Sequence, residues 1–387
     1  MINYDELLAP AAKSMRPSGI RKFFDLAADM PHCISLGVGE PDFKTPWSVR
    51  DAGIRSLELG RTKYTANAGL KELRSEICNY LARRFELHYK EENVLVTVGG
   101  SEAIDLTIRA LVQPGDEVVI PEPCFVCYEP ITQLTGGVPV HIATRAEDQF
   151  RLTADQLRAA ITPKTKLLIF PYPNNPTGAV MSAAEMEEIA AVLRETNVVV
   201  LSDEIYSELT YGLDRHVSIA SLPGMAERTI TLNSFSKNFL MTGWRVGVII
   251  AEPEFLDVMN RINGSLVYSA PSISQRAGIQ ALAMRKEIRE KYVTAYRDRI
   301  FYSADRIEKI PYLSLVRPKG TFYLFPGVEK TGLDDKQFCK ELLERAHVLV
   351  SAGSPFGKTG ANHFRIACTV GIDQLKQAFD RMEKLEF

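Results

Sequence analysis

The sequence lacks an excess of charge of either sign. Its 387 residues include 46 Lys and Arg against 48 Asp and Glu, so the formal net charge at pH 7 is only −2. A protein that binds nucleic acid or an anionic membrane needs a basic field to attract the phosphates. We therefore expect neither nucleic acid nor a membrane among its partners, and we expect small-molecule substrates instead.

Long apolar runs and a cysteine framework are also missing. No apolar stretch approaches the roughly 18 residues that a membrane span needs. The start, MINYDELLAPAAKSM, lacks the charged-then-apolar pattern of a signal peptide. The six cysteines are scattered through the chain, unlike the dense disulfide sets of small secreted domains. These absences favour a reducing compartment, and we expect the cytoplasm.

Two short motifs suggest ligand sites but lack the context that such sites need. CFVC, at 124–127, has the spacing of a metal or redox pair, but no second pair follows at a zinc-ribbon distance. GVGEPD, at 37–42, has Asp42 where a dinucleotide fingerprint needs its third glycine. We therefore predict neither a metal nor a dinucleotide.

Apolar runs alternate with helical patterns through the middle of the chain. The segments NVLVTV, KLLIF, NVVVL and RTITL are each rich in Val, Ile or Leu, which is typical of strands covered on both faces in a parallel sheet. The segment 70–85 has apolar residues at helical spacing. We therefore predict an α/β fold, with a mostly parallel sheet covered by helices in a large domain over residues 46–285.

The last third of the chain has a different pattern. Residues 284–310 are predicted to form one long, charged amphipathic helix, followed by short apolar runs and a final helix. This pattern predicts a smaller α+β domain over residues 286–387. The N-terminal residues 1–45 are expected to pack with it.

Polar groups follow four of the apolar runs, at the points where the strands should end. Ligands of open α/β sheets bind beyond the carboxyl ends of the strands, so these groups are expected to face one crevice. The four polar segments are 99–102, 174–178, 202–206 and 233–237.

The residue types in this crevice point to one kind of ligand. Lys237 ends a buried strand, where an aldehyde could remove its charge by forming a Schiff base. Asp203, also at a strand end, needs a cation, and a protonated ring nitrogen would serve. Singly, each residue has an ordinary interpretation, since Asp203 could cap a helix and Lys237 could lie at the surface. Their joint occurrence in this order indicates pyridoxal phosphate.

A phosphate site is predicted beside them. Gly99 and Gly100 precede a helical pattern, and a helix N-terminus offers free N–H donors and a positive dipole. Ser234 and Arg245 could add a hydroxyl and a bidentate guanidinium.

These residues resemble the class I/II aminotransferases of the fold-type I pyridoxal-phosphate enzymes, in the aspartate/aromatic branch that includes PatA-like proteins. The resemblance covers almost the whole chain. It rests on the motifs YTANAGLKELR, VTVGGSEA, NNPTG, SDEIY, SFSKNFLMTGWRVG and HFRIA.

The resemblance implies pyridoxal 5'-phosphate as cofactor and a role for each matching residue. Lys237 is expected to form the Schiff base and to move the proton, and Asp203 to pair with the ring nitrogen. Asn175 and Tyr206 are expected to donate to the ring oxygen. We predict Lys237, Asp203 and Tyr206 as the catalytic residues, with Phe125 stacked on the ring.

The phosphate and the substrate are assigned in the same way. Gly100 and Ser101 are expected to hold the phosphate through their amides, together with Ser234 and Arg245. Tyr64 matches a tyrosine that reaches the neighbouring subunit's cofactor, which implies a homodimer with shared active sites. For the substrate α-carboxylate, the resemblance implies a site formed by Arg365, Gly39 and Asn175.

The implied activity is ping-pong transfer of an amino group from an aromatic or aspartate-type L-amino acid to a 2-oxo acid such as 2-oxoglutarate. Ser101 and Ile20 depart from the residues of some aspartate-preferring relatives. Apolar residues expected near the substrate side chain are Ile20, Phe24, Phe322 and Tyr323.

Three other functions stay open. An acyl-diaminopimelate is a further possible substrate, and a C–S lyase would use the same cofactor residues. A regulator fused to a DNA-binding module is less expected, because the family pattern begins by about Ser18 and the net charge is negative.

Overall fold

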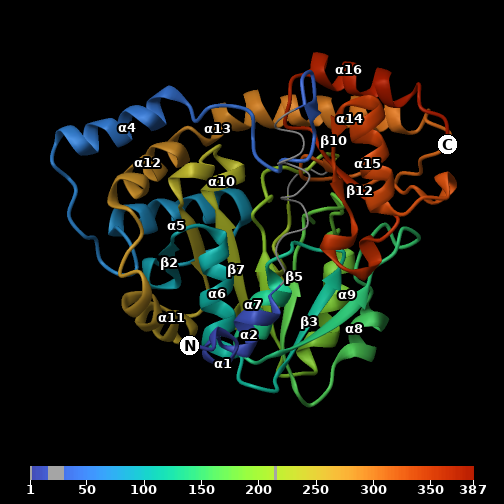
Figure 1. Ribbon diagram of the computed structural model, residues 1–387. Coiled ribbons are helices and arrows are strands. Elements are labelled where there is room, and N and C mark those ends of the chain that lie inside the picture. The colour runs from blue at the N-terminus through green and yellow to red at the C-terminus, as the bar shows by residue number, and fades with distance from the viewer. Residues whose placement is uncertain (1, 16–29, 213–215) are drawn as a thin grey trace.

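The chain folds around a seven-stranded sheet, which Figure 1 shows in the computed structural model. The structure describes residues 2–15, 30–212 and 216–387. The strands lie in the order β2-β8-β7-β6-β5-β3-β4. Their bounds are β2 Val94–Thr97, β3 Glu117–Glu122, β4 Val138–Ala143, β5 Thr165–Phe170, β6 Val199–Asp203, β7 Thr229–Ser234 and β8 Gly247–Ile250.

The sheet is mostly parallel, as predicted. The pairs β4–β3, β3–β5, β5–β6 and β6–β7 are parallel, whereas β8 runs antiparallel to both β7 and β2. Two antiparallel steps leave β2 running in the direction of β7. The carboxyl ends of β2, β5, β6 and β7 therefore reach the same edge of the sheet.

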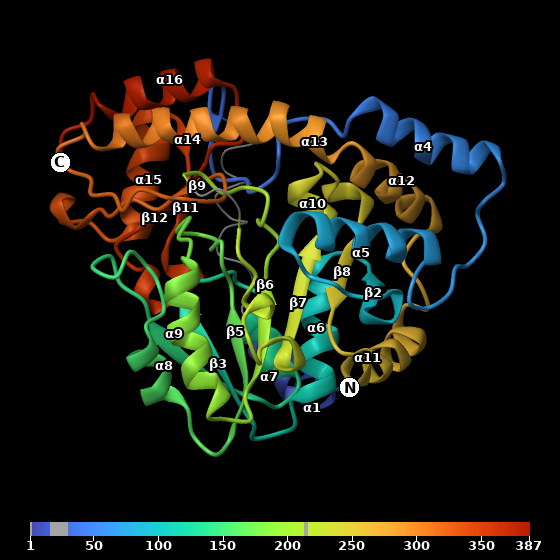
Figure 2. The same ribbon diagram turned by 180° about the vertical axis from the view of Figure 1, so that it is seen from behind.

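Helices cover both faces of this sheet, as the front and back views of Figures 1 and 2 show. The side chains of α6, α7 and α11 pack in one buried cluster, and those of α5, α8, α9 and α12 pack on the opposite face. Because both faces are covered, nearly every side chain of β5, β6 and β7 is buried. The helix bounds are α4 Trp47–Glu58, α5 Lys71–Phe85, α6 Gly100–Leu111, α7 Tyr128–Leu134, α8 Ala154–Ala160, α9 Ala183–Arg194, α11 Pro253–Leu266 and α12 Ser272–Ala283.

The C-terminal part has its own small sheets and its own core. Strands β9 Tyr323–Leu324, β11 Ser351–Ala352 and β12 Phe364–Ala367 form an antiparallel sheet. Helices α15 Asp335–Ala346 and α16 Ile372–Met382 bury their apolar faces in the cluster that includes this sheet.

The N-terminal segment meets this part through strand pairing. Strand β1, Ile34–Ser35, pairs in parallel with β10, Val348–Leu349. The domain boundaries, 46–285 for the large domain and 1–45 with 286–387 for the small one, stay a prediction.

The connection between the two parts differs from the single helix predicted over 284–310. Helix α13, Arg285–Ile288, continues through a π-helical turn at Arg289–Val293 into α14, Thr294–Ile307. Figure 2 shows α13 and α14 running in one line along the top of the molecule. The spacing of apolar residues does not reveal the widened turn, since the helical path continues through it.

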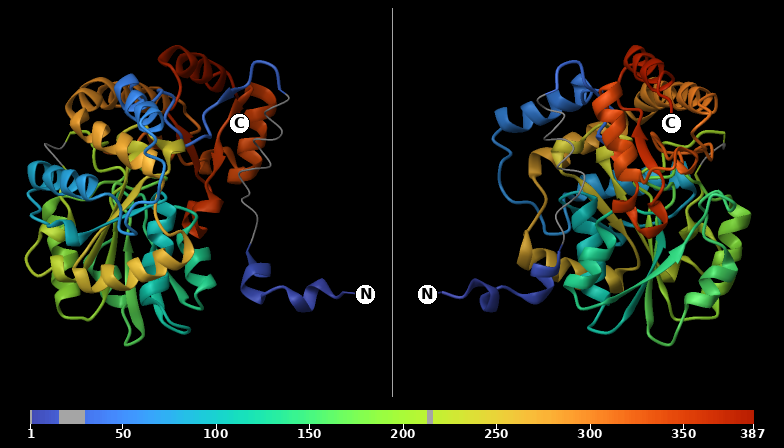
Figure 3. Two further views of the ribbon diagram at one scale, coloured as in Figure 1. Left: turned by 90° about the vertical axis from the view of Figure 1, so that its left-hand side faces the viewer. Right: turned by 45° about the vertical axis from the view of Figure 1, so that its right-hand side comes forward.

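The N-terminal segment projects from the molecule in Figure 3: α2, Pro10–Ser14, lies beside α7, and α1, Tyr4–Leu7, extends away from the remainder of the chain. Ile2, Tyr4 and Leu7 are each at least 67% exposed there. Across the residues that the structure describes, no helix has both the length and the apolar character needed to cross a membrane.

Candidate active site

A cavity of about 330 Å³ lies at the edge of the sheet where the carboxyl ends of the strands meet. All four polar segments predicted to converge contribute to its wall. The predicted site residues that line it are Gly39, Gly100, Ser101, Phe125, Asn175, Asp203, Tyr206, Lys237, Arg245 and Arg365.

The N-terminus of α6 forms one wall of the cavity. Helix α6 begins at Gly100, and its N-cap, Gly99, has a φ of 87° and provides no capping side chain. The Arg245 guanidinium lies beside this turn and donates to the carbonyl oxygens of Thr242 (3.0 Å) and Val98 (3.3 Å). A Cβ at position 99 would lie 2.3 Å from the Nη2 of Arg245, so only glycine allows this approach. The helix dipole and the guanidinium together suit a phosphate.

Lys237 lies on α10, Phe235–Asn238, a short helix directly after β7. Its Nζ donates to the carbonyl oxygen of Gly39 at 2.6 Å. Burial lowers the pKa of Lys237 to about 8, although the nearby Glu40 carboxylate opposes the shift. The partly buried amine is therefore neutral in about a tenth of the molecules at pH 7, far more than an ordinary lysine, and the neutral form is the one that acts as a nucleophile or general base.

Asp203 ends β6 and is buried. The Tyr128 hydroxyl donates to its Oδ2 at 2.6 Å, and the N–H of Ile205 donates to its Oδ1 at 3.2 Å. Burial raises the pKa of Asp203 to about 6, and these two hydrogen bonds limit the rise. A buried carboxylate of this kind is well placed to pair with a cationic ring nitrogen.

Tyr128 is a site residue that the sequence does not reveal. It lies three residues after Phe125, and its ring meets the Phe125 ring edge-on with centroids 5.9 Å apart. The only signal in the sequence is a tyrosine shortly after the predicted stacking residue. Nothing in the sequence connects it with a carboxylate 75 positions later.

Arg365 is held between two aromatic rings at the other end of the cavity. Its guanidinium carbon lies 4.4 Å from the Tyr323 ring centroid and 4.8 Å from that of Phe356. Nη1 donates to Oδ1 of Asn175 at 2.9 Å, and Nη2 donates to the Gly37 carbonyl oxygen at 2.9 Å. The buried Nε has no hydrogen-bond partner among the described residues. A planar guanidinium fixed in this way suits the bidentate binding of a carboxylate.

Tyr206 joins this group through its hydroxyl, which lies 3.0 Å from the Tyr323 hydroxyl. Because Arg365 occupies the carbonyl oxygen of Asn175, the amide nitrogen of Asn175 is the group left to donate into the cavity. Asn175 and Tyr206 can therefore both donate to an anionic oxygen.

Ser234 and Phe322, both predicted near the ligand, do not line the cavity, whereas Tyr64 was assigned to the neighbouring subunit and its position in the single chain leaves that assignment a prediction. Ser234 is buried and does not line the cavity, because its Oγ bonds the Val246 carbonyl oxygen (3.1 Å) and Ser236 Oγ (3.0 Å). Ser236 lines the cavity in its place. Tyr64 is 83% exposed and lies against Tyr268, away from the cavity of its own chain. Phe322 is fully buried behind the wall, with its ring centroid 6.0 Å from Lys237 Nζ.

Among the four apolar residues expected near the substrate side chain, Tyr323 lines the cavity. Ile20 and Phe24 lie outside the described residues.

The donor set fits the cofactor that the resemblance implies. Pyridoxal 5'-phosphate carries an aldehyde, a basic ring nitrogen, a ring hydroxyl and a phosphate. The cavity offers an amine of lowered pKa, a buried carboxylate, neutral donors and a helix N-terminus with a guanidinium, one group for each.

Comparison with known proteins agrees with this geometry. The family model described as "Aminotransferase class I and II" matches residues 31–382. YugH of Bacillus subtilis is 47% identical over 97% of both chains, and the aspartate aminotransferase of Pyrococcus abyssi is 41% identical over 96% of both. The solved structure of an aromatic aminotransferase from Pyrococcus horikoshii has a TM-score of 0.89 and 38% identity, covering 95% of this chain and 98% of that one.

The family match and these relatives each span nearly the whole chain. Class I and II aminotransferases use pyridoxal 5'-phosphate, and the cavity contains the groups that this cofactor needs. The chain therefore belongs to the class I and II aminotransferases, in their aspartate and aromatic branch, and is a transaminase that depends on pyridoxal 5'-phosphate.

Proposed function

We propose that this transaminase takes the amino group of an L-amino acid with an aromatic or other bulky apolar side chain and passes it to 2-oxoglutarate. The observation that supports this donor is the apolar wall of the cavity beside Arg365. The cations among the described lining residues are Lys237, Arg245 and Arg365. With Lys237 assigned to the aldehyde, Arg245 to the phosphate and Arg365 to the α-carboxylate, the second carboxylate of 2-oxoglutarate needs a cation from the partner subunit.

The neighbourhood of Arg365 supports the same donor class. Phe125, Val126, Tyr323 and Phe356 line the cavity, and two of these rings flank the guanidinium. An apolar side chain can bury its surface against such walls without leaving a charge unpaired. Aspartate stays the alternative donor, since several relatives bear that name.

In this proposal Lys237 acts at two moments. Its Nζ would hold the cofactor through the aldehyde, and, once free, it would take the proton from the substrate Cα and give it back. The cofactor, when bound, supplies the electron-withdrawing ring that weakens the Cα–H bond, which no side chain here can supply. The pKa of Lys237, about 8, suits an amine that must both accept and give up a proton.

The other residues hold the cofactor and the substrate in place and stabilise the charges on them. Asp203 would hold a proton at the ring nitrogen, while the Asn175 amide and the Tyr206 hydroxyl would donate to the ring oxygen. Arg365 binds the α-carboxylate and so fixes the Cα–H bond relative to the ring. Donor and acceptor use the cavity in turn, which gives ping-pong kinetics.

We further propose a homodimer with shared active sites, in the cytoplasm. Tyr64, which the resemblance assigns to the neighbouring subunit's cofactor, is exposed in the single chain. Large apolar side chains are also exposed on and near α4, and the protruding N-terminal helices expose more. A dimer would also let the partner subunit supply a cation for the second carboxylate of 2-oxoglutarate.

A half-reaction screen tests the proposed donor. The cofactor-loaded enzyme is mixed with each of the twenty amino acids, and the cofactor's absorbance is followed without any 2-oxo acid. We expect phenylalanine, tyrosine or another bulky apolar amino acid to react fastest, and 2-oxoglutarate to restore the starting spectrum. Faster reaction with aspartate would contradict the proposed donor, and release of ammonia without an acceptor would indicate a lyase.

A further inference from the structure

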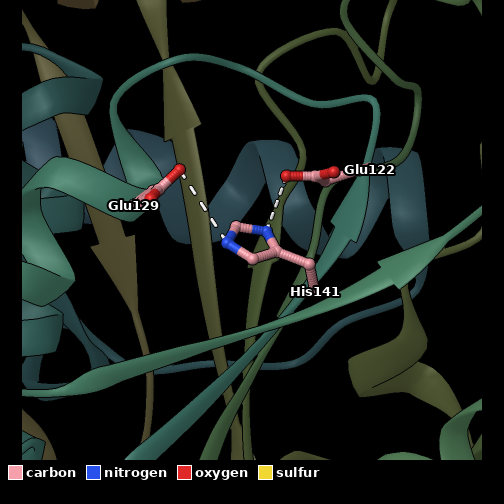
Figure 4. Close-up of side chains that lie close together, drawn as sticks. All are labelled: Glu122, Glu129 and His141. Atoms are coloured by element: carbon pink, nitrogen blue, oxygen red, sulfur yellow. Dashed lines mark ion pairs between the residues drawn. The ribbon is translucent and has the colours of Figure 1, made fainter. Parts of the chain in front are cut away.

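Glu122, at the end of β3, is a buried carboxylate that joins three separate segments of the chain. Its Oε1 pairs with Nδ1 of His141 on β4 at 2.6 Å. Its Oε2 accepts the backbone N–H of Lys358 at 3.0 Å. Figure 4 shows His141 between Glu122 and Glu129 of α7, with Glu129 at 3.8 Å from Nε2.

The segment that contains Lys358 approaches the end of β3 unusually closely. Gly357 has a φ of 123°, and a Cβ built on it would lie 2.5 Å from the carboxyl carbon of Glu122. The N–H of Cys124 donates to the Phe356 carbonyl oxygen at 2.9 Å. Two hydrogen bonds therefore tie segment 356–358 to segment 122–124, and glycine is required at 357 for this contact.

Both tied segments carry walls of the active site. Phe125 follows directly after 122–124, and Phe356 lies within 356–358. The Phe356 ring supports the guanidinium of Arg365 at 4.8 Å. A shift of segment 356–358 away from Glu122 would therefore remove one of the two rings that fix Arg365.

We propose that Glu122 is a positioning residue for substrate binding, which holds segment 356–358 against the end of β3 so that Arg365 meets the substrate carboxylate in a fixed orientation. This inference rests on the proposed role of Arg365. Glu122 itself does not line the cavity. It acts through Phe356 and its main-chain neighbours.

A metal centre is the other interpretation of Glu122, Glu129 and His141, since single ligand atoms from all three lie within 4.8 Å of one another. The two closest approaches, however, use different nitrogens of the imidazole, Nδ1 for Glu122 and Nε2 for Glu129. One ion binds only one of these nitrogens. The arrangement is therefore that of an imidazole between two carboxylates.

His141 makes the attachment sensitive to pH. The hydrogen bond with Glu122 raises the pKa of His141, with a smaller contribution from the Glu129 carboxylate, while burial and the Lys358 ammonium lower it. The charged form therefore dominates below the raised pKa, where it holds the Glu122 carboxylate most firmly. This additional attraction between His141 and Glu122 is lost as the pH rises through the pKa of His141.

The test uses the holoenzyme and 3-phenylpropionate, an apolar carboxylate without an amino group, with its Kd measured by calorimetry. Glu122→Ala removes the carboxylate from the contact, and Gly357→Ala adds a Cβ on the other side of it. Glu129→Gln is the matched control, because Glu129 touches His141 but not segment 356–358. Arg365→Lys reports on the proposed carboxylate site itself.

We expect the Kd to rise about tenfold in Glu122→Ala and Gly357→Ala, the loss that roughly one charge-assisted hydrogen bond represents. The Kd of the cofactor should change less than about twofold, and amide hydrogen exchange of segment 356–358 should accelerate. Glu129→Gln should bind the probe within about twofold of the wild type. If Glu122→Ala does not fold, the Kd of Gly357→Ala for the probe tests the proposal in its place.

Two results would overturn the proposal in distinguishable ways. If Arg365→Lys weakens the probe but Glu122→Ala and Gly357→Ala do not, the positioning role is wrong and the carboxylate site stands. If wild type and Arg365→Lys bind the probe equally, the proposed carboxylate site is wrong, and the positioning role is wrong with it.

The pH dependence is tested with His141→Asn, which keeps a hydrogen-bond donor near the position of Nδ1 but carries no charge. The wild type should bind 3-phenylpropionate more tightly than this variant only below the pKa of His141. If the ratio of the Kd of His141→Asn to that of the wild type does not change with pH, the proposed pH dependence is wrong.

Discussion

The hydroxyl of Tyr128 donates a 2.6 Å hydrogen bond to the buried carboxylate of Asp203. The two residues come from different elements, α7 and β6, and each lines the cavity. The bond orients the carboxylate and favours its ionised form. We expect Asp203 to depend on Tyr128 for both.

Tyr128→Phe should therefore raise the pKa of Asp203 above its present value of about 6, because burial then acts with one opposing hydrogen bond fewer. At neutral pH a smaller fraction of Asp203 would be ionised. We expect kcat at pH 7 to fall about tenfold, the cost of roughly one hydrogen bond to a charged group. The acidic limb of the kcat/KM profile should move to higher pH, and an unmoved limb would show that Tyr128 only fills space.

Lys237→Met should make the cofactor-free protein more stable near neutral pH. The folded-state pKa of Lys237 is lowered to about 8, below its ordinary value, so folding disfavours the ammonium. The unfolded chain binds more protons between these two values, and wild-type stability should rise with pH across that range. We expect the variant to gain about 1–2 kcal/mol at pH 7.

Urea unfolding of both cofactor-free proteins at several pH values measures this gain. The gap between variant and wild type should close as the pH rises from about 8 towards 10.5. A gap that does not change with pH would mean that the ammonium is not penalised by burial.

Gly99→Ala should weaken cofactor binding, because the new Cβ would meet the Arg245 guanidinium at 2.3 Å and displace it from the N-terminus of α6. Gly115→Ala is the matched control, since Gly115 also has a positive φ, 92°, but nothing lies within 4 Å of its built Cβ. Both variants should lose about 1 kcal/mol of stability from backbone strain.

Cofactor titration, followed by protein fluorescence, separates the two variants. We expect only Gly99→Ala to raise the cofactor Kd, by about tenfold, because a displaced guanidinium loses a charge-assisted bond to the phosphate. Equal affinities in the two variants would indicate that Arg245 does not bind the phosphate.

Much of this site could be predicted because it depends on chain order. The apolar runs within KLLIF, NVVVL and RTITL indicate buried strands, and parallel strands bring the residues that follow them to one edge. Asn175, Asp203 and Lys237 were predicted to meet for this reason, and all three line the cavity.

What the sequence did not reveal depends on side-chain direction and on contacts between distant segments. Ser234 and Ser236 have the same chemistry, and only the backbone at the start of α10 decides which of them faces the cavity. The bond between Tyr128 and Asp203 depends on how α7 packs near the end of β6. The antiparallel direction of β8 is equally invisible, since apolar content alone does not give a strand its direction.

The shared active site can be tested with two inactive variants, Tyr64→Ala and Lys237→Ala. If Tyr64 serves the partner subunit, a mixed dimer contains one site with an intact Tyr64 and an intact Lys237. Mixing the variants under conditions that exchange subunits should then restore activity well above that of either alone. If Tyr64 acted in its own chain, both sites of the mixed dimer would be defective, and mixing would restore nothing.

The most direct measurement fixes the cofactor chemically to the protein. Borohydride reduction of the holoenzyme converts an imine between a lysine and the cofactor's aldehyde into a stable amine, and peptide mass spectrometry then locates it. We predict the phosphopyridoxyl mass on Lys237, between Ser236 and Asn238. Finding that mass on another lysine, or on none, would contradict it.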